Sequence, residues 1–343
     1  MTDKNYRVAI IGLGRMGSTI DDEMAAGAPA YSVAAACRAS QRLEVVAGAD
    51  IDPAKRAAFQ SRWGVTALYD DYLEMIRQEQ PDLVAICTKG VLHAEMSVAV
   101  AEAGAPMIFC EKAIACSMEE ADAVLAAVGS RNIPFNTGVL RRFNRTFHTA
   151  RQMIADGEIG EPRAAVHYAA SNLLHGHIHS LDTLSFLLGD PQVVSIWGEL
   201  LPRDTVIENN RLDKDPNAIY QALFANGVEA TTAPAGTWEF EVIGSLGSVS
   251  VRNGEVGVRL RKAESEKKRL FLDAPVPAVE AHSTTQFCLE DLLDAYETGR
   301  PTLGNIQLTH HITEACLAVA ESHRLQRRIT LPLENRSLYI FHV

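Results

Sequence analysis

The chain has 343 residues, of which 47% are hydrophobic and 22% charged, as expected for a globular protein of about two domains. Its net charge of -11 argues against a general nucleic-acid binder, because neutralising phosphates requires a basic surface. No apolar run approaches the roughly 18 residues that a membrane span requires. We therefore expect neither a nucleic acid nor a membrane as partner.

The cysteines and the amino-terminal residues indicate a compartment. The six cysteines lie in apolar stretches, with no Cys-x-x-Cys pair and no spacing typical of a small disulfide-rich domain (Cys37, Cys87, Cys110, Cys116, Cys288, Cys316). We interpret them as buried, reduced thiols. The first residues run directly into an apolar strand and do not resemble a secretory signal. The sequence thus predicts a soluble, cytoplasmic protein.

Residues 1–134 alternate between apolar runs and helical stretches. The apolar runs are continuous, as in strands buried on both faces, and cover residues 6–11, 43–49, 83–87 and 107–110. Helices are predicted from residue 17 onward and over 53–63, 71–80, 93–103 and 117–128. Asp52-Pro53 and the pair Ser117 and Glu120 are helix-start signals. This alternation predicts an α/β Rossmann domain with a doubly wound parallel sheet.

Residues 135–343 show a different pattern, predicting an α+β domain with a large, mostly antiparallel open sheet. Short strands are predicted over 163–170, 193–198, 218–224, 228–232, 238–243 and 248–251, with turns at Asn226-Gly227 and Asn253-Gly254. Helices are predicted over 147–156, 179–188 and 309–325. We assign substrate binding and oligomerisation to this domain, and expect its last residues to pack back on the first domain.

A dinucleotide-binding fingerprint follows the first predicted strand. Gly12-Leu13-Gly14-Arg15-Met16-Gly17 fits Gly-x-Gly-x-x-Gly between a buried strand and a helix. The glycines permit a tight turn, a close approach to a diphosphate and close helix–strand packing. The following helix would offer its first N–H groups to the diphosphate. The alternative is a tight turn without a ligand.

Asp50, at the end of the second predicted strand, is the candidate for binding the adenosine ribose. A carboxylate there accepts hydrogen bonds from both hydroxyls and repels a 2′-phosphate, which favours NAD over NADP. Asp50 lies 33 residues after Gly17, beyond the usual interval of about 20. We interpret residues 25–40 as an inserted loop or helix extension near the cofactor. Asp52 is expected to cap the next helix.

Ordered motifs farther along resemble the glucose–fructose oxidoreductase/inositol dehydrogenase family. They are Ala85-Ile86-Cys87-Thr88 with His93, Cys110-Glu111-Lys112, Gly160-Glu161-Pro162 and His179-Ser180-Leu181-Asp182. The resemblance runs from Tyr6 to about Leu333. Ala113 stands where the family usually has proline, and Thr88-Lys89-Gly90 lacks the family's Pro-Asn pair.

The resemblance implies an NAD-binding site that includes Thr88, His93, Glu111 and Lys112. In the family the lysine equivalent to Lys112 touches both substrate and cofactor. Lys112 lies at the carboxyl end of a predicted parallel strand, where such sheets place ligands. A lysine can hold the substrate oxygen and stabilise its developing charge, or act as a base if burial lowers its pKa. The alternative is an exposed lysine at a strand end.

Three alternating histidines define the expected substrate site, in Asn172-Leu173-Leu174-His175-Gly176-His177-Ile178-His179. The family carries an aspartate four residues before a histidine here. His179 matches the histidine and is the candidate general base, whereas His175 replaces the aspartate and is a candidate for substrate binding or deprotonation. Asn172 is included as a substrate residue. On an extended strand the three histidines would share one face, which admits a metal site, but no carboxylate or cysteine ligand accompanies them.

Charged residues complete the expected site. Asp182 lies one helical turn after His179 and would either orient it or serve as a first-turn acid. Arg142-Phe143 matches an arginine–phenylalanine pair that often borders the family's substrate. Basic residues gather near this expected site: Arg141, Arg142, Arg145 and Lys89. They suggest a carboxylate, sulfonate or phosphate on the substrate. The alternative is a solvated basic face.

The leading interpretation is an NAD-dependent oxidoreductase that oxidises a ring hydroxyl of a sugar, a sugar acid, a sulfonated sugar or a cyclitol. One alternative is an NAD-dependent glycoside hydrolase, which would oxidise, eliminate, hydrate and reduce with NAD recycled. Another is a non-catalytic NAD-binding regulatory protein. No metal is assigned. We expect a homodimer or homotetramer, because the predicted open sheet has a face to cover and family members commonly pair through it.

Overall fold

The computed structural model describes residues 5–252, 257–265 and 268–343. Packing divides the chain into two compact units. The first comprises Met1–Leu140, Ala281–His310 and Val343; the second comprises Arg141–Glu280 and His311–His342. The sequence predicts a boundary at residue 134, and it does not anticipate that residues 281–310 belong with the first unit.

The first unit is built on a six-stranded parallel sheet in the order β3-β2-β1-β4-β5-β6. The strands are β1 (Tyr6–Ile11), β2 (Leu43–Ala49), β3 (Ala67–Tyr69), β4 (Leu83–Ile86), β5 (Met107–Cys110) and β6 (Phe135–Thr137). The order reverses between β1 and β4, and this is the switch point where doubly wound sheets bind ligands. The Rossmann fold predicted from the apolar runs is confirmed.

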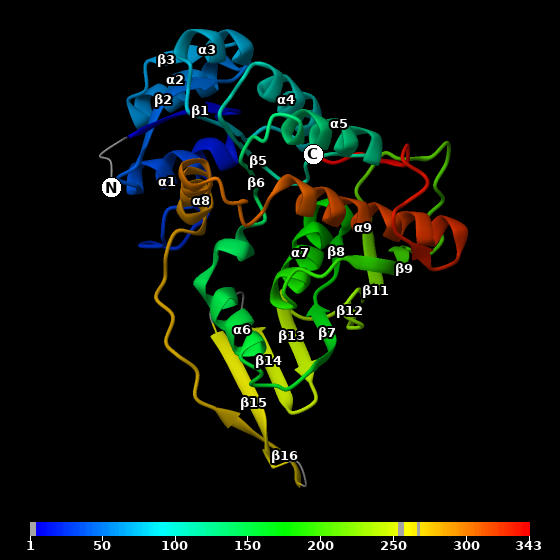
Figure 1. The fold of residues 1–343 in the computed structure, drawn as a ribbon. Coiled ribbons are helices and arrows are strands. Elements are labelled where there is room, and N and C mark those ends of the chain that lie inside the picture. The colour runs from blue at the N-terminus through cyan, green and yellow to red at the C-terminus, as the bar shows by residue number, and fades with distance from the viewer. Residues whose placement is uncertain (1–4, 253–256, 266–267) are drawn as a thin grey trace. The chain divides into compact units, whose positions relative to one another are not determined.

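Helices pack around this sheet (Figure 1). They are α1 (Val33–Ala39), α2 (Pro53–Trp63), α3 (Tyr72–Glu79), α4 (Gly90–Glu102), α5 (Met118–Gly129) and α8 (Thr284–Thr298). Asp52 and Ser117 cap α2 and α5 through backbone N–H groups, confirming both helix-start signals. Helix α8, absent from the sequence prediction, packs against α1, β5 and β6. The Asn136 amide on β6 donates to the Asp291 carboxylate of α8 at 2.9 Å.

The second unit contains a ten-stranded sheet whose main path is β16-β15-β14-β13-β7-β12-β11-β9-β17, with β8 paired to β11. The strands are β7 (Pro162–Tyr168), β8 (Ser171–Asn172), β9 (Val193–Leu201), β11 (Asn217–Phe224), β12 (Glu229–Ala233), β13 (Glu239–Gly244), β14 (Gly247–Arg252), β15 (Gly257–Ser265), β16 (Lys268–Ala274) and β17 (Ile329–Thr330). All strand pairs are antiparallel except β7 with β12, which agrees with a mostly antiparallel sheet. The predicted turn at Asn253-Gly254 lies outside the described residues.

Helices of the second unit pack on this sheet. Helix α6 (Arg145–Ala155) contacts β14 and β15, and α7 (Ile178–Leu187) contacts β7 and α6. The long helix α9 (Ile306–Leu325) starts in the first unit and continues in the second. A small separate ladder pairs β10 (Arg211–Leu212) in parallel with β18 (Tyr339–Ile340). Turns η3 (Leu140–Phe143) and η4 (Leu173–His177) precede α6 and α7.

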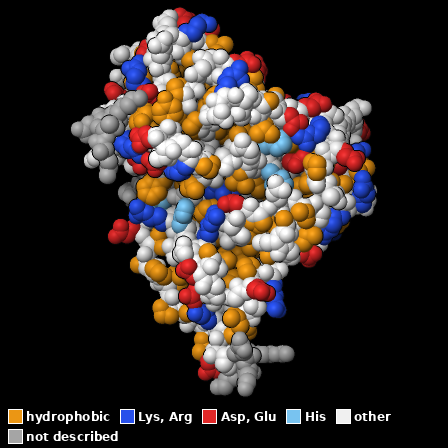
Figure 2. Space-filling view, in the orientation of Figure 1, with side chains coloured by type: hydrophobic (Ala, Val, Ile, Leu, Met, Phe, Trp, Pro, Cys, Tyr) orange, Lys and Arg blue, Asp and Glu red, His pale blue; other side chains and the backbone are white. Residues whose placement is uncertain are grey.

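The surface carries charges of both signs. Figure 2 shows acidic and basic side chains interspersed with hydrophobic ones over the face in view. Within the described part of the chain, every helix is too short or too polar to cross a bilayer. All six cysteines are buried and unbridged.

Candidate functional site

The loop after β1 is a tight turn in which each glycine meets a different constraint. Gly12 has a φ of 89°, and a Cβ there would lie 2.7 Å from the Cys87 carbonyl oxygen. A Cβ on Gly17 would overlap the Gly12 carbonyl. A Cβ on Gly14 would meet, among the described atoms, only the Lys55 Nζ at 3.9 Å. Gly14 therefore borders open space, as a residue beside a bound diphosphate should.

The segment after this loop differs from the predicted helix. Residues Arg15–Thr19 form a single π-helical turn, η1, which contains Arg15 and Met16 and leads into a 3₁₀ turn, η2 (Ile20–Glu23). The following residues include Gly27 and Pro29, which do not favour continuation of a helix. The Asp21 carboxylate then accepts hydrogen bonds from the backbone of Tyr31 and Ser32, at 2.7 and 3.1 Å. The predicted insertion, residues 25–40, thus consists of a loop that Asp21 holds at Tyr31 and Ser32 and of the helix α1.

Asp50 lies at the carboxyl end of β2, next to the glycine loop. Its Oδ2 accepts a hydrogen bond from the Leu13 N–H at 2.9 Å, and its Oδ1 accepts one from the Asp52 N–H at 3.0 Å. The Lys55 Nζ is 3.8 Å from the same carboxylate. Lys55 is not among the residues predicted from the sequence. Its position in the first turn of α2, after the Asp52-Pro53 signal, is the feature that could have indicated it.

His93 links the residues that follow β4 to those that follow β5. Its buried ring places Nδ1 2.8 Å from the Ala113 carbonyl oxygen and Nε2 3.1 Å from that of Thr88. Both partners are acceptors, so a neutral ring can donate to only one of them. His93 thereby fixes the loop that bears Thr88 against the segment that bears Lys112.

Glu111 and Lys112 follow β5 directly, at the carboxyl edge of the sheet. Glu111 is 6% exposed, whereas Lys112 is half-buried. The Lys112 N–H donates to Glu111 Oε2 at 3.3 Å. Burial raises the pKa of the Glu111 carboxyl, and the charges of Lys112 and Arg15 oppose that rise. Gly138 packs so closely that a Cβ there would overlap this carboxylate.

The histidine segment of the second unit is helical rather than extended. Asn172 ends β8, and residues Leu173–His177 form the π-helical turn η4, which continues into α7. His175 is exposed and His179 is half-buried, with its ring centroid 6.4 Å from that of Trp238. The shared strand face that would have admitted a metal is therefore not formed. Among the described residues, no three His, Cys, Asp or Glu side chains are arranged as metal ligands.

His177 belongs to the interior of the second unit. Its Nε2 donates to the Ala218 carbonyl oxygen at 2.8 Å, which leaves Nδ1 to accept from the Ser180 hydroxyl at 3.1 Å. Ser180 is in turn 2.9 Å from the Tyr220 hydroxyl. The ring thus has both nitrogens bonded within the protein, as buried polar groups normally do.

Arg142 and Asp182 form a buried ion pair. The Arg142 Nε donates to Asp182 Oδ1 at 2.8 Å, and its Nη1 donates to Asp190 at 2.8 Å. Burial raises the pKa of Asp182, and Arg142 opposes that rise. The guanidinium expected to border the substrate is therefore held by two carboxylates of its own unit. Asp182, proposed to orient His179, is bonded to Arg142.

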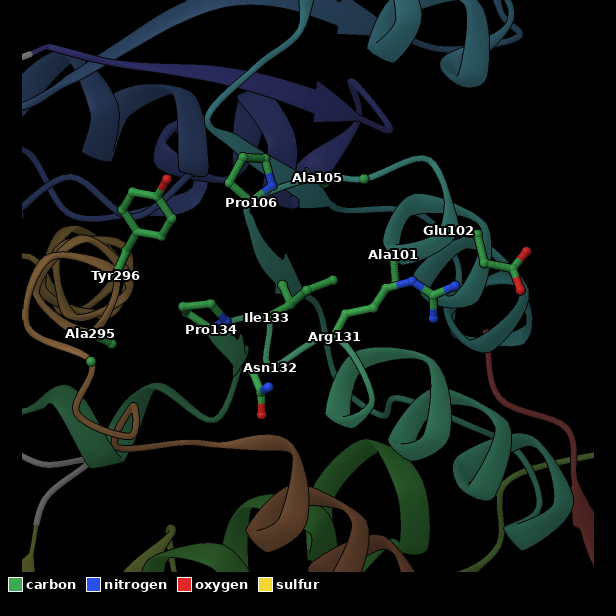
Figure 3. Close-up of a pocket in the computed structure, with 12 residues that line it drawn as sticks. Ala101, Glu102, Ala105, Pro106, Arg131, Asn132, Ile133, Pro134, Ala295 and Tyr296 are labelled. Carbon is green, nitrogen blue, oxygen red and sulfur yellow. The ribbon is translucent and has the colours of Figure 1, made fainter.

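A pocket of about 410 Å³ lies in the first unit (Figure 3). It is lined by residues before β5 and β6, such as Pro106 and Pro134, and by Tyr296 of α8. This is the amino edge of the parallel sheet, whereas the glycine loop and Lys112 lie at the carboxyl edge. Ligands of doubly wound sheets bind at the carboxyl edge, so we do not assign the cofactor to this pocket.

The residues at the carboxyl edge fit a dinucleotide. Three features agree with what the fingerprint predicts for a diphosphate and a ribose: the open space beside Gly14, the first N–H groups of η1 without a capping side chain, and the Asp50 carboxylate. Residues 6–138 match the family model described as "Oxidoreductase family, NAD-binding Rossmann fold". Residues 6–138, the Rossmann half of the chain, therefore belong to this family of NAD-binding oxidoreductases.

Relatives and solved structures extend the similarity. The chain is 27% identical to scyllo-inositol 2-dehydrogenase (NAD(+)) of Bacillus subtilis, over 73% of this chain and 74% of that protein. It spans 55% of the length of the inositol dehydrogenases of Thermotoga maritima and Salmonella paratyphi B. An aldose-aldose oxidoreductase from Caulobacter crescentus, complexed with glycerol, has a TM-score of 0.79 at 19% identity, over 96% of this chain and 100% of that one. An Agrobacterium radiobacter oxidoreductase in complex with NAD+, L-tartaric acid and magnesium has a TM-score of 0.76 at 16% identity, over 95% and 98%.

Proposed function

We propose that this protein is a dehydrogenase that oxidises a ring hydroxyl of a cyclitol or sugar. The observation that carries the proposal is the placement of Lys112, beside buried Glu111, at the same sheet edge as the glycine loop and Asp50. The inositol dehydrogenases among the relatives support the substrate class. The buried, unbridged cysteines support a cytoplasmic location.

In this proposal Lys112 and His179 have separate tasks. The Lys112 ammonium holds the oxygen of the reacting hydroxyl and stabilises negative charge that develops on it. The half-buried His179 accepts the hydroxyl proton as general base. NAD held by the glycine loop and Asp50 would supply the hydride acceptor. Glu111 and His93 act on the position of Lys112, through its backbone N–H and the adjoining Ala113 carbonyl.

Acidic substrates have weaker support than neutral ones. Arg142 is already paired with Asp182 and Asp190, so a carboxylate, sulfonate or phosphate would depend on Arg141 or Arg145 instead. A neutral analogue that reacts as well as the acidic sugar would remove the need for an anion-binding group.

A redox-coupled glycoside hydrolase is the second candidate. The observation in its favour is the imidazole of His175 at the position where the family carries a carboxylate. An exposed imidazole near a bound sugar can give up or take up a proton near neutral pH, as elimination and hydration of a glycoside would require. This reaction would leave no net NADH.

Proton NMR of the protein with NAD and a panel of substrates tests the proposal. The panel contains myo-inositol, scyllo-inositol, neutral sugars, acidic sugars and their glycosides. We expect NADH to accumulate in step with a ketone or lactone product. Glycoside cleavage without net NADH would replace the proposal with the hydrolase, and no turnover despite measurable NAD binding would favour a regulatory NAD-binding protein.

Two variants make the assignment residue-specific. H179Q should lower kcat by about 10²- to 10⁴-fold, the range for loss of a general base, while NAD still binds. H282Q, a histidine outside the proposed site, should retain wild-type kinetics. Equal activity of both variants would contradict the role of His179.

A further inference from the structure

The helical segment that carries His175 and His179 is capped by a residue about 40 positions away. The N–H groups of Leu174 and His175 donate to Asp215 Oδ1 and Oδ2, at 3.0 and 2.7 Å. The Asn172 amide donates to the Asp215 backbone carbonyl at 2.8 Å. A carboxylate at the amino-terminal end of a helix accepts hydrogen bonds from N–H groups that have no intrahelical partner. Its negative charge also interacts favourably with the positive end of the helix dipole. Asp215 therefore fixes where η4 begins.

The same carboxylate faces a third histidine. His342 follows β18, which the parallel ladder with β10 holds in register, and Asp215 lies three residues after β10. The His342 Nδ1 is 3.6 Å from Asp215 Oδ2, within ion-pair range when the ring is protonated. The His342 side chain is 4% exposed, and its ring centroid is 5.8 Å from that of exposed His175.

We propose that Asp215 and His342 are positioning residues for His175, so that the substrate end of this segment is a three-residue unit rather than one exposed imidazole. Asp215 sets the backbone of His175, and His342 packs beside its ring. Asp215 alone would be an ordinary helix cap. The buried imidazole of His342, 3.6 Å from the carboxylate oxygen that accepts the His175 N–H, is what a cap does not require.

Asp215 and His342 act on His175 in two respects, the placement of its ring in the protein (the structural half) and its binding of substrate (the functional half). The functional half rests on the proposed dehydrogenase, because it assumes that His175 contacts the substrate. The structural half does not, since it concerns the ring of His175 in the protein without substrate. An experiment on the histidine rings thus distinguishes a failure of this inference from a failure of the proposed function.

The test is NMR of the full chain labelled with ¹³C at the histidine Cε1 positions. H175Q and H342Q each remove one signal and so assign the two rings. We expect the His175 signal to shift in both D215N and H342Q, and the His342 signal to shift in D215N. D213N is the matched control, since Asp213 lies two residues away with its side chain 82% exposed and paired to Arg211, and it should move neither signal.

A second readout covers the case in which D215N fails to fold. H342Q leaves the cap intact and D215E retains the charge, so a folded variant is available for the same comparison. An unchanged His175 signal in folded H342Q and folded D215N would overturn the proposal. For any panel compound that is turned over, H342Q should raise KM by about fivefold with kcat nearly unchanged, because a displaced His175 ring weakens binding of the substrate and of the transition state alike. Equal losses in H342Q and D213N would overturn the functional half.

Discussion

His167 and His177 are two buried imidazoles of the second unit with different surroundings. His177 is hydrogen-bonded through both nitrogens. His167, on β7, is stacked on Phe240 and tilted against Trp238, each at a centroid distance of 4.9 Å. Among the described residues neither ring nitrogen of His167 has a hydrogen-bond partner. Burial lowers the pKa of His167 to about 3 and that of His177 to about 4, and the proximity of the two rings adds to the lowering for His167.

These two histidines make the free energy of unfolding depend on pH. The unfolded chain takes up protons on them below about pH 6.5, while the folded chain does not until about pH 4 or lower. Their contribution is therefore complete above about pH 6.5 and is lost as the pH falls, by about 1.4 kcal/mol per pH unit for each group.

H167F tests this at a single residue. Urea unfolding between about pH 6 and about pH 4.5 should show a slope against pH that is lower than wild type by about 1.4 kcal/mol per unit. H282Q should keep the wild-type slope, because His282 is not part of this buried cluster. An H167F slope equal to that of wild type would mean that His167 takes up a proton in the folded protein.

At the scale of elements, the sequence predicts best those strands and helices whose signals lie within the element itself. Strands β1, β2 and β5 match their predicted bounds, because a strand buried on both faces is a continuous apolar run. Helix α2 also matches, since its cap and first-turn proline lie next to each other in the chain. Such local signals predict most of the Rossmann half and the glycine loop.

Elements and contacts that depend on distant partners are not predicted from the sequence. Strand β6 contains the polar Asn136, whose amide is buried only because α8 supplies Asp291 and the Cys288 carbonyl as partners. The histidine segment admits an extended alternative in which its three histidines share a face, and the Asp215 carboxylate that binds the start of its helical turn lies about 40 residues away. The buried ion pairs of Arg142 with Asp182 and Asp190 likewise join residues that are distant in the sequence. No local pattern contains these partners.

The glycine loop gives a prediction at the same scale. G14A should fold with nearly wild-type stability, because its Cβ enters open space, but it should weaken NAD binding by about tenfold, or ~1.4 kcal/mol. G17A should instead lose about 1–3 kcal/mol of unfolding free energy, since its Cβ overlaps the Gly12 carbonyl. Calorimetric NAD titration and urea unfolding measure the two effects. Wild-type NAD affinity in G14A would place the diphosphate elsewhere.

At the scale of the molecule, the β15–β16 ribbon is the most exposed apolar part of the large sheet. On β16, Leu270, Phe271 and Leu272 are 51%, 41% and 49% exposed. Successive residues of a strand point to opposite faces, so both faces of this edge strand are uncovered. Proteins normally protect such edges with charge, short strands or another chain. We propose that a second copy covers this ribbon.

Light scattering after size exclusion tests this self-association. The wild-type protein should elute with a mass at least twice the 37.4 kDa of one chain. L270E/L272E should shift it toward a single chain, because charges on one face of β16 cannot be buried against a partner without large desolvation cost. V206E makes the same chemical change at an isolated residue that is 71% exposed, and it should leave the mass unchanged. A double variant with the wild-type mass would place the contact on another surface. A monomeric wild-type protein would mean that no second copy covers this edge.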